Sequence, residues 1–158
     1  MNPFENPSEV AYENLFHVGV VVSDLTEGME RMSSQLGLTW APIRTFPVTV
    51  ADAEGRTESV EVRATYSNQG PPHVELIQAA GDGLWSVGHA GGVHHFGLFV
   101  DDLETELERL ESEGFVRELQ GAAEPGKLSG PVYLSNSLGL RVELVGSEGK
   151  VMISDWVS

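Results

Sequence analysis

The sequence predicts an α+β domain in which two βαβββ modules pair into a cupped mixed sheet, with their helices on its outer face. The main observation is an internal repeat: LFHVGVVVSDL, which begins at Leu15, returns as VHHFGLFVDDL, which begins at Val93. The copies align on the third-place histidines, His17 and His95, and Gly, Val, Asp and Leu follow at matching positions in both. The same order of helix-like and strand-like segments follows each copy, which indicates a duplicated unit. One such unit is too small to bury a core well, and pairing two in one curved sheet solves that problem.

The first module is expected over residues 15–78. It opens with the apolar run LFHVGVVV, which is typical of a strand buried on both faces. In residues 23–38 the apolar residues recur three or four positions apart, which predicts a helix that Ser23 or Asp24 caps and Gly37 ends. The runs IRTFPVTV, ESVEVRATY and HVELIQ are strand-like, and the turn-rich ADAEGR separates the first two.

The second module, over residues 93–145, repeats this order with the strand VHHFGLFV, the helix DDLETELERLESEG and the strands FVRELQ, PVYLSN and LRVELV. Residues 1–14 form a lead-in, and the glycine-rich residues 79–92 form a linker between the modules. The C-terminal segment, residues 146–158, is expected to add an edge strand or a dimer contact. Exposed sheet edges and the apolar VMISDWVS predict a homodimer.

Composition restricts the function classes. At 41% hydrophobic residues the chain of 158 residues is a globular protein, and without cysteine it forms neither disulfides nor thiolate metal sites. No long apolar run and no signal-peptide pattern are present, which favours a cytoplasmic protein. The 24 acidic residues outnumber the 9 basic residues, and the net charge of −15 argues against nucleic acid and against an anionic membrane surface. A small molecule is the expected partner.

The repeated histidines are the first candidate site residues. Because side chains alternate along a strand, His17 shares a face with Gly19, and His95 shares a face with Gly97. A glycine inside a strand often marks a place where a ligand needs room. By the same alternation, His94, which is the alternative candidate to its neighbour His95, is expected to face the helix layer.

Two glutamates complete the candidate set. Glu75 and Glu143 occupy equivalent VEL triplets in the last strand of each module. A carboxylate buried in a sheet is costly without a compensating cation. Any one of these residues has an ordinary structural explanation, but repetition in register favours a metal site. Two imidazoles and two carboxylates suit Zn, Co, Ni, Mn or Fe.

The motifs FHVGVVVSDL, HHFGLFVDDLE, VELI and VELV resemble the vicinal-oxygen-chelate superfamily, which includes glyoxalase I, methylmalonyl-CoA epimerase, extradiol dioxygenases and bleomycin-resistance proteins. The resemblance covers about residues 15–145 and is greatest to the glyoxalase and epimerase branch. It implies paired βαβββ modules with one divalent metal ion on the inner face. Transferred by position, the metal ligands are His17, Glu75, His95 and Glu143.

Three functions compete. The leading one is a metal-dependent isomerase, epimerase or lyase that forms an enolate, with Glu143 as the catalytic base and Glu75 as its pseudo-symmetric partner. The second is a non-heme iron dioxygenase, which needs two histidines and one carboxylate, so that the extra Glu75 counts against it. The third is a protein that sequesters a small molecule without a metal, and the retention of all four ligand positions counts against that.

Weaker candidates concern substrate contacts. An anionic substrate, such as a carboxylate or a CoA phosphate, is expected to meet arginine. Aromatic residues are expected at the cavity walls and mouth. The candidates are Arg44, Arg63, Phe46, Tyr66, Trp85 and Phe99.

Overall fold

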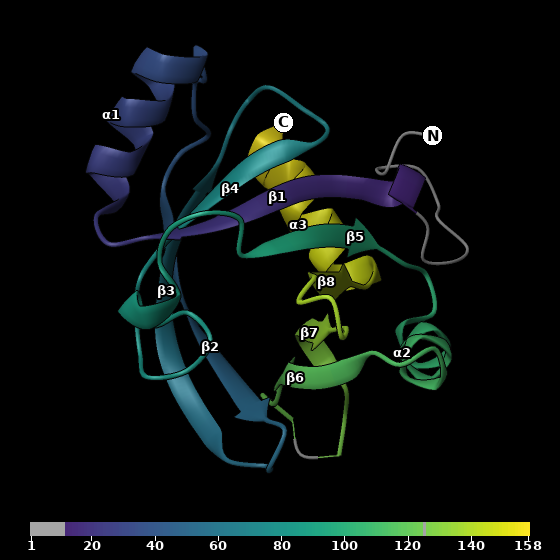
Figure 1. The fold of residues 1–158 in the computed structure, drawn as a ribbon. Helices are drawn as coiled ribbons and strands as arrows, with labels where there is room; N and C mark the ends of the chain where they lie inside the picture. Colours follow the sequence, from purple (N-terminus) through teal and green to yellow (C-terminus); the bar gives the residue numbers. More distant parts are fainter. Residues whose placement is uncertain (1–11, 125) are drawn as a thin grey trace.

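The computed structural model describes residues 12–124 and 126–158, and within them eight strands close into a barrel (Figure 1). The strands are β1 (Leu15–Val22), β2 (Arg44–Asp52), β3 (Thr57–Tyr66), β4 (His73–Gln78), β5 (His95–Phe99), β6 (Val116–Gly121), β7 (Ser129–Ser135) and β8 (Arg141–Val145). The helices are α1 (Leu25–Leu36), α2 (Leu103–Ser112) and α3 (Ser147–Val157), with short 3-10 turns η1 (Tyr12–Asn14) and η2 (Val87–His89). The lead-in expected over residues 1–14 lies mostly outside the described residues.

The two modules occupy separate halves of the barrel. Its strand order is β1-β4-β3-β2-β6-β7-β8-β5, so each module contributes four neighbouring strands. Within the modules, β1 is parallel to β4 and β5 is parallel to β8. Between them, β1 pairs antiparallel with β5, and β2 with β6. The predicted pairing of two βαβββ modules is therefore confirmed, and it takes place within one chain.

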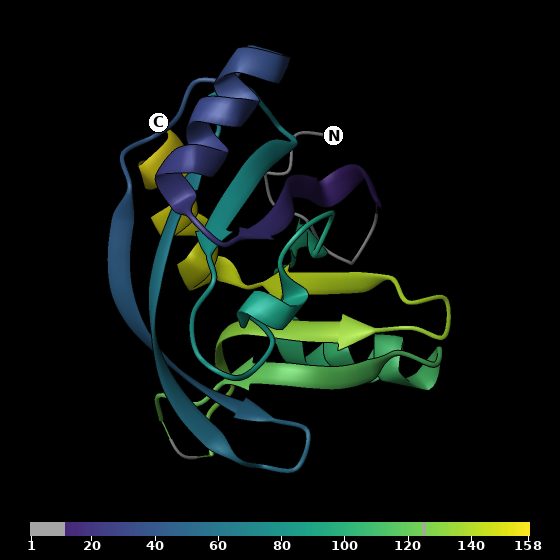
Figure 2. The ribbon, with the colours of Figure 1, turned by 60° about the vertical axis from the view of Figure 1, so that its left-hand side comes forward.

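Helices α1 and α2 lie on the outer face of the barrel, as predicted (Figure 2). Asp24 caps α1 by accepting a hydrogen bond from the Glu27 amide (3.0 Å), and Gly37 ends it in the left-handed conformation. On α2, Leu107 and Leu110 are buried in a cluster with the outward-facing side chains of β5, β7 and β8. No helix in the described part of the chain is long and apolar enough to cross a membrane.

The C-terminal segment differs from the expectation. Residues Ser147–Val157 form α3 instead of an edge strand, and the strand prediction is wrong. Ile153, Trp156 and Val157 recur three and four positions apart, a helical spacing that buries Ile153 and Trp156 in the cluster of the barrel interior. The Trp156 indole also donates to the Pro42 carbonyl (2.7 Å).

Closure of the barrel also removes one argument for a homodimer. In the described strands every member of the sheet has two neighbours, so the exposed edges expected from the sequence are absent. What remains is the outer side of α3, where Val151 is 71% exposed. The homodimer stays a prediction that rests on this helix.

Candidate metal centre

The two repeated histidines meet where the modules join. In the antiparallel pair of β1 and β5, His17 lies opposite Gly97 and Gly19 lies opposite His95. A Cβ atom at Gly19 would stand 2.1 Å from the His95 ring, and one at Gly97 would stand 2.1 Å from the His17 ring. The glycines therefore leave room for a side chain of the other module. The expectation that they make room for a ligand is wrong in this respect, because the imidazoles occupy that space.

The two glutamates flank the histidines on the neighbouring parallel strands. Glu75 on β4 is in register with Gly19, and Glu143 on β8 is in register with Gly97. Each glutamate therefore points to the same side of the sheet as the histidines. Both glutamates are buried, with 8% of each residue exposed. The duplicated sequence thus places one histidine and one glutamate of each module around a common point.

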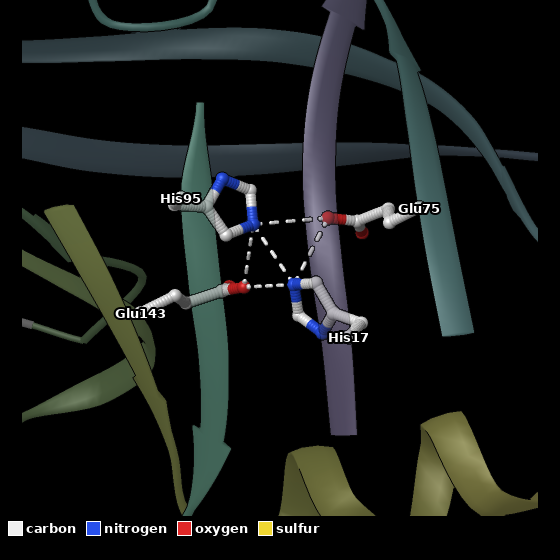
Figure 3. Close-up of side chains that lie close together, drawn as sticks. All are labelled: His17, Glu75, His95 and Glu143. Carbon is white, nitrogen blue, oxygen red and sulfur yellow. Dashed lines mark hydrogen bonds and ion pairs between the residues drawn. The ribbon is translucent and has the colours of Figure 1, made fainter. Parts of the chain in front are cut away.

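The ligand atoms of the four side chains lie within 4.8 Å of one another (Figure 3). The Nε2 atoms of His17 and His95 are 2.8 Å apart. Glu75 Oε1 lies 3.3 Å and 3.2 Å from these two nitrogens, and Glu143 Oε1 lies 3.1 Å and 3.2 Å from them. The two carboxylates approach the histidine pair from opposite sides (Figure 3).

This arrangement fits a divalent cation. Two Nε2 atoms 2.8 Å apart cannot both carry a proton directed into the gap, whereas a cation accepts both lone pairs. The buried Glu143 Oε1 lies near His17 but accepts no well-directed hydrogen bond. The spacing of the ligand atoms also agrees, since an octahedron with bonds of about 2.1 Å has edges of about 3.0 Å.

The four groups compensate one another electrostatically in the absence of a metal. Burial alone would lower the pKa of His17, but the charges of Glu75 and Glu143 raise it to about 9. The pKa of His95 is raised as well, because the adjacent carboxylates of Glu143 and Glu75 outweigh the effects of burial and of the charge of His17. The pKa of each glutamate is lowered, because the histidines outweigh the effect of burial. A bound cation would take the place of the one proton that can lie between the two Nε2 atoms.

His94 supports the centre from behind and does not face the helix layer. Its Nε2–H donates to the Leu84 carbonyl in the linker (2.8 Å), and its Nδ1 lies 2.8 Å from the Nδ1 of His95. Burial and the charge of His95 lower the pKa of His94 to about 4, so its Nδ1 is an acceptor. His95 can then donate from Nδ1 and, when a metal replaces its Nε2 proton, offer the Nε2 lone pair to that metal. The prediction for His94 is wrong because β5 begins only at His95, so strand alternation does not apply to His94.

Two buried tyrosines stand beside the glutamates. Tyr66 is in register with Glu75 on the neighbouring strand, and Tyr133 is in register with Glu143. Burial and then the charge of Glu143 raise the pKa of Tyr133 well above its usual value. The Trp85 indole donates to the Tyr133 hydroxyl (3.3 Å).

Tyr66 and Trp85 are among the candidates predicted from the sequence, whereas Tyr133 was missed. A signal was present, since a tyrosine precedes Ser-Asn at the end of the third strand in both modules, as YSN and YLSN. The second copy is one residue longer, which breaks the simple alignment.

A cavity of about 370 Å³ opens above the two carboxylates. Three of the residues predicted to contact a substrate, Phe46, Tyr66 and Trp85, line it, and α3 closes one side with Ile153 and Trp156. Glu75 and Glu143 form its polar floor, while the side chains of His17 and His95 are fully buried behind them. Most of the remaining wall is apolar.

The other three residues predicted to contact a substrate, Arg44, Arg63 and Phe99, do not line this cavity, contrary to the prediction. Arg44 pairs with Asp155 (3.5 Å) on α3 and stacks on the Trp156 ring. Arg63 alternates with inward-facing neighbours, so it points away from the interior and donates to Gln78 (3.1 Å). Phe99 is stacked in the core, with its ring 3.6 Å from that of Phe16.

Comparison with known proteins identifies a family. The sequence model of the Glyoxalase/Bleomycin resistance protein/Dioxygenase superfamily matches residues 16–133. No significant match is found among functionally curated proteins.

Solved structures share the fold. Methylmalonyl-CoA epimerase from Mycobacterium tuberculosis is similar with a TM-score of 0.57 and 21% identity over 88% of this chain and 91% of that one. A hypothetical protein from Bacillus halodurans has a TM-score of 0.55 and 14% identity over 84% and 93% of the chains. A Streptomyces coelicolor methylmalonyl-CoA epimerase has a TM-score of 0.53 and 17% identity over 84% and 93%. At these identities the likeness concerns the fold.

Proposed function

The chain belongs to the Glyoxalase/Bleomycin resistance protein/Dioxygenase superfamily, and on that premise we propose that it is a metal-dependent isomerase, epimerase or lyase. Its substrate would be a small carbonyl compound or thioester. The observation that carries the proposal is the cluster of two histidines and two glutamates at the floor of an apolar cavity. A divalent metal held by His17, Glu75, His95 and Glu143 would act as a Lewis acid that acidifies a C–H bond beside a carbonyl and stabilises the enolate.

Glu143 is the proposed catalytic base, and Glu75 is its partner on the opposite side. Both carboxylates line the cavity, so either can reach a substrate C–H, whereas the histidines behind them cannot. A carboxylate that faces a largely apolar cavity can remove a proton from a bound substrate and return it to a neighbouring carbon. Two carboxylates on opposite sides suit a reaction that moves a proton between carbons or between the faces of one carbon.

Two further residues are proposed as positioning residues. His94 holds the ring of His95 through their Nδ1 contact and is itself fixed by the Leu84 carbonyl. Tyr133, held by the Trp85 indole, stands beside Glu143. Leu84 and Trp85 are adjacent, so one turn of the linker supports one histidine and one glutamate of the second module.

The similar structures are consistent with this reaction class. The Streptomyces coelicolor epimerase was solved in complex with 2-nitronate-propionyl-CoA, a compound that carries a nitronate anion in a CoA thioester. A dioxygenase is the weaker alternative, because Glu75 would occupy a position that an iron site with two histidines and one carboxylate leaves open.

The test is an anaerobic incubation in deuterated water with 2-oxo hemithioacetals, 2-substituted acyl-CoA thioesters and α-hydroxyketones, read by mass spectrometry. The protein should incorporate deuterium beside a carbonyl. In Glu143→Gln and Glu75→Gln, turnover should fall by about 100-fold or more, and by more than metal affinity falls. Glu61→Gln, which changes an exposed glutamate of β3, is the matched control.

Other outcomes would contradict the proposal. Oxygen consumption with ring-cleaved products would indicate a dioxygenase, and tight binding without exchange would indicate sequestration. Exchange that survives both Glu→Gln changes would refute the assignment of the base.

A further inference from the structure

The cavity wall is dominated by aromatic side chains. Five aromatic residues line it, together with aliphatic residues of β2, β3, β4 and α3. These aromatic residues are Phe46, Tyr66, Trp85, Tyr133 and Trp156. Such a wall binds an apolar or aromatic body well and offers few partners to a strongly hydrated group.

Charged side chains around the mouth are predominantly acidic. Besides the two floor carboxylates, the charged residues that line the cavity are Asp101, Glu148 and Lys127, all exposed. Lys127 is paired with Glu124 (3.6 Å). The first turn of α3 also lines the cavity, but Glu148 lies within it and occupies the end of the helix that favours anions.

The other basic side chains do not line the cavity, and most of them form ion pairs with carboxylates. Seven of the nine lysines and arginines form ion pairs with carboxylates, and Lys127 is the only lining residue among them. Of the other two, Arg63 donates to Gln78, and Lys150 does not line the cavity. Among the described residues that line the cavity there is therefore no arginine to bind a phosphate or a substrate carboxylate.

We propose that the site takes a small, uncharged, largely apolar substrate with neighbouring carbonyl or hydroxyl oxygens, and that it rejects anionic conjugates such as CoA thioesters. This inference rests on the proposed function, because the neighbouring oxygens are those that a metal centre would engage. Phosphates of CoA would have to lie at an acidic mouth of a protein whose net charge is −15. A neutral molecule enters the same cavity without this repulsion.

The experiment compares two matched probes, 2-hydroxyacetophenone and benzoylformate. Both carry a phenyl ketone with a second oxygen on the next carbon, but only benzoylformate is charged. Trp85 and Trp156 line the cavity, so quenching of tryptophan fluorescence reports binding, and calorimetry confirms it. Binding is measured at low and high ionic strength, with propionyl-CoA as a third probe, independently of turnover.

We expect benzoylformate to bind at least about tenfold more weakly than 2-hydroxyacetophenone at low ionic strength. Added salt should reduce this ratio, because it screens the acidic mouth. The double variant Asp101→Asn, Glu148→Gln should also reduce it, whereas Glu61→Gln on the outer face should leave it unchanged.

Binding of benzoylformate or propionyl-CoA as tight as that of the neutral ketone would overturn the inference. So would a ratio that neither salt nor the double variant changes, or failure of the neutral ketone to bind. If 2-hydroxyacetophenone binds preferentially but no substrate exchanges its protons, the proposed function fails and the preference of the cavity for neutral molecules stands.

Discussion

Replacing Gly19 by alanine tests how the two modules build the centre. The new methyl group would lie 2.1 Å from Cε1 and 2.3 Å from Nε2 of the His95 ring. Carbon atoms in contact are normally about 3.5 Å apart or more, so the ring has to withdraw by about 1.4 Å. Metal ligands hold their distances to within about 0.2 Å. We therefore expect that His95 can no longer serve as a metal ligand in this variant, although it remains in the sequence.

We expect metal affinity in Gly19→Ala to fall at least about 100-fold, which is the upper range for loss of a supporting contact alone. Overpacking costs about 1–3 kcal/mol, which lowers the Tm by roughly 5 °C in a domain of this size. Competition with a fluorescent zinc chelator measures the affinity, and calorimetry measures the Tm. Gly88→Ala is the matched control, because its nearest neighbour, the Ser86 hydroxyl, would lie at 3.7 Å. Unchanged metal affinity in Gly19→Ala would refute the placement of the His95 ring.

Three further predictions concern His94, the protonation of His17 and the association of two chains. His94→Leu should lower zinc affinity by about 10–100-fold, and His94→Asn, whose side-chain oxygen replaces Nδ1, should restore part of that affinity. In ¹⁵N NMR spectra of the zinc-loaded protein, Nδ1 of His95 should be protonated. An unprotonated Nδ1 would contradict the proposed role of His94. Because the metal-free fold raises the pKa of His17 from 6.5 to about 9, its protonation stabilises that fold fully below pH 6.5 and less as the pH rises through 9. Chelator-treated protein should therefore lose Tm over this range, and a Tm that rises with pH there would count against it. Sedimentation at micromolar concentration should show a homodimer formed through the exposed side of α3, around Val151, and a monomer would exclude it.

The pairing of two βαβββ modules in one curved sheet was predictable because the sequence repeats the same order of strand and helix patterns, whereas the closure of that sheet into a barrel was not predicted. The apolar run of β1 and the helix between Asp24 and Gly37 recur in the second module. Each copy of the unit therefore has the same apolar face to bury, and the two copies can bury these faces together. Helix α3 has no counterpart in the repeat. Its apolar residues were interpreted by composition instead of by their spacing, so the packing of Ile153 and Trp156 against the barrel interior was missed.

The four proposed ligands were predictable for the same reason, since each module supplies one histidine and one glutamate at equivalent strand positions. The orientation of the His94 side chain depends on where β5 begins. That start is set by the pairing of β1 with β5 and by the contact of His94 with the linker. The directions of the Arg44 and Arg63 side chains depend on their partners, Asp155 on α3 and Gln78 on β4, which are distant from them in sequence. The internal repeat thus predicted the cluster of two histidines and two glutamates. Contacts that occur in only one module could not be predicted from the repeat.

The central claim is one divalent metal ion held by His17, Glu75, His95 and Glu143. Elemental analysis of the purified protein, followed by calorimetric titration of the chelator-treated protein with Zn²⁺, Co²⁺, Ni²⁺ and Mn²⁺, tests it most directly. The account predicts one ion per chain in the wild type, a higher Tm on binding, and loss of that binding in the double variant His17→Ala, His95→Ala. Absence of binding in the wild type, or binding that persists unchanged in a folded double variant, would contradict it.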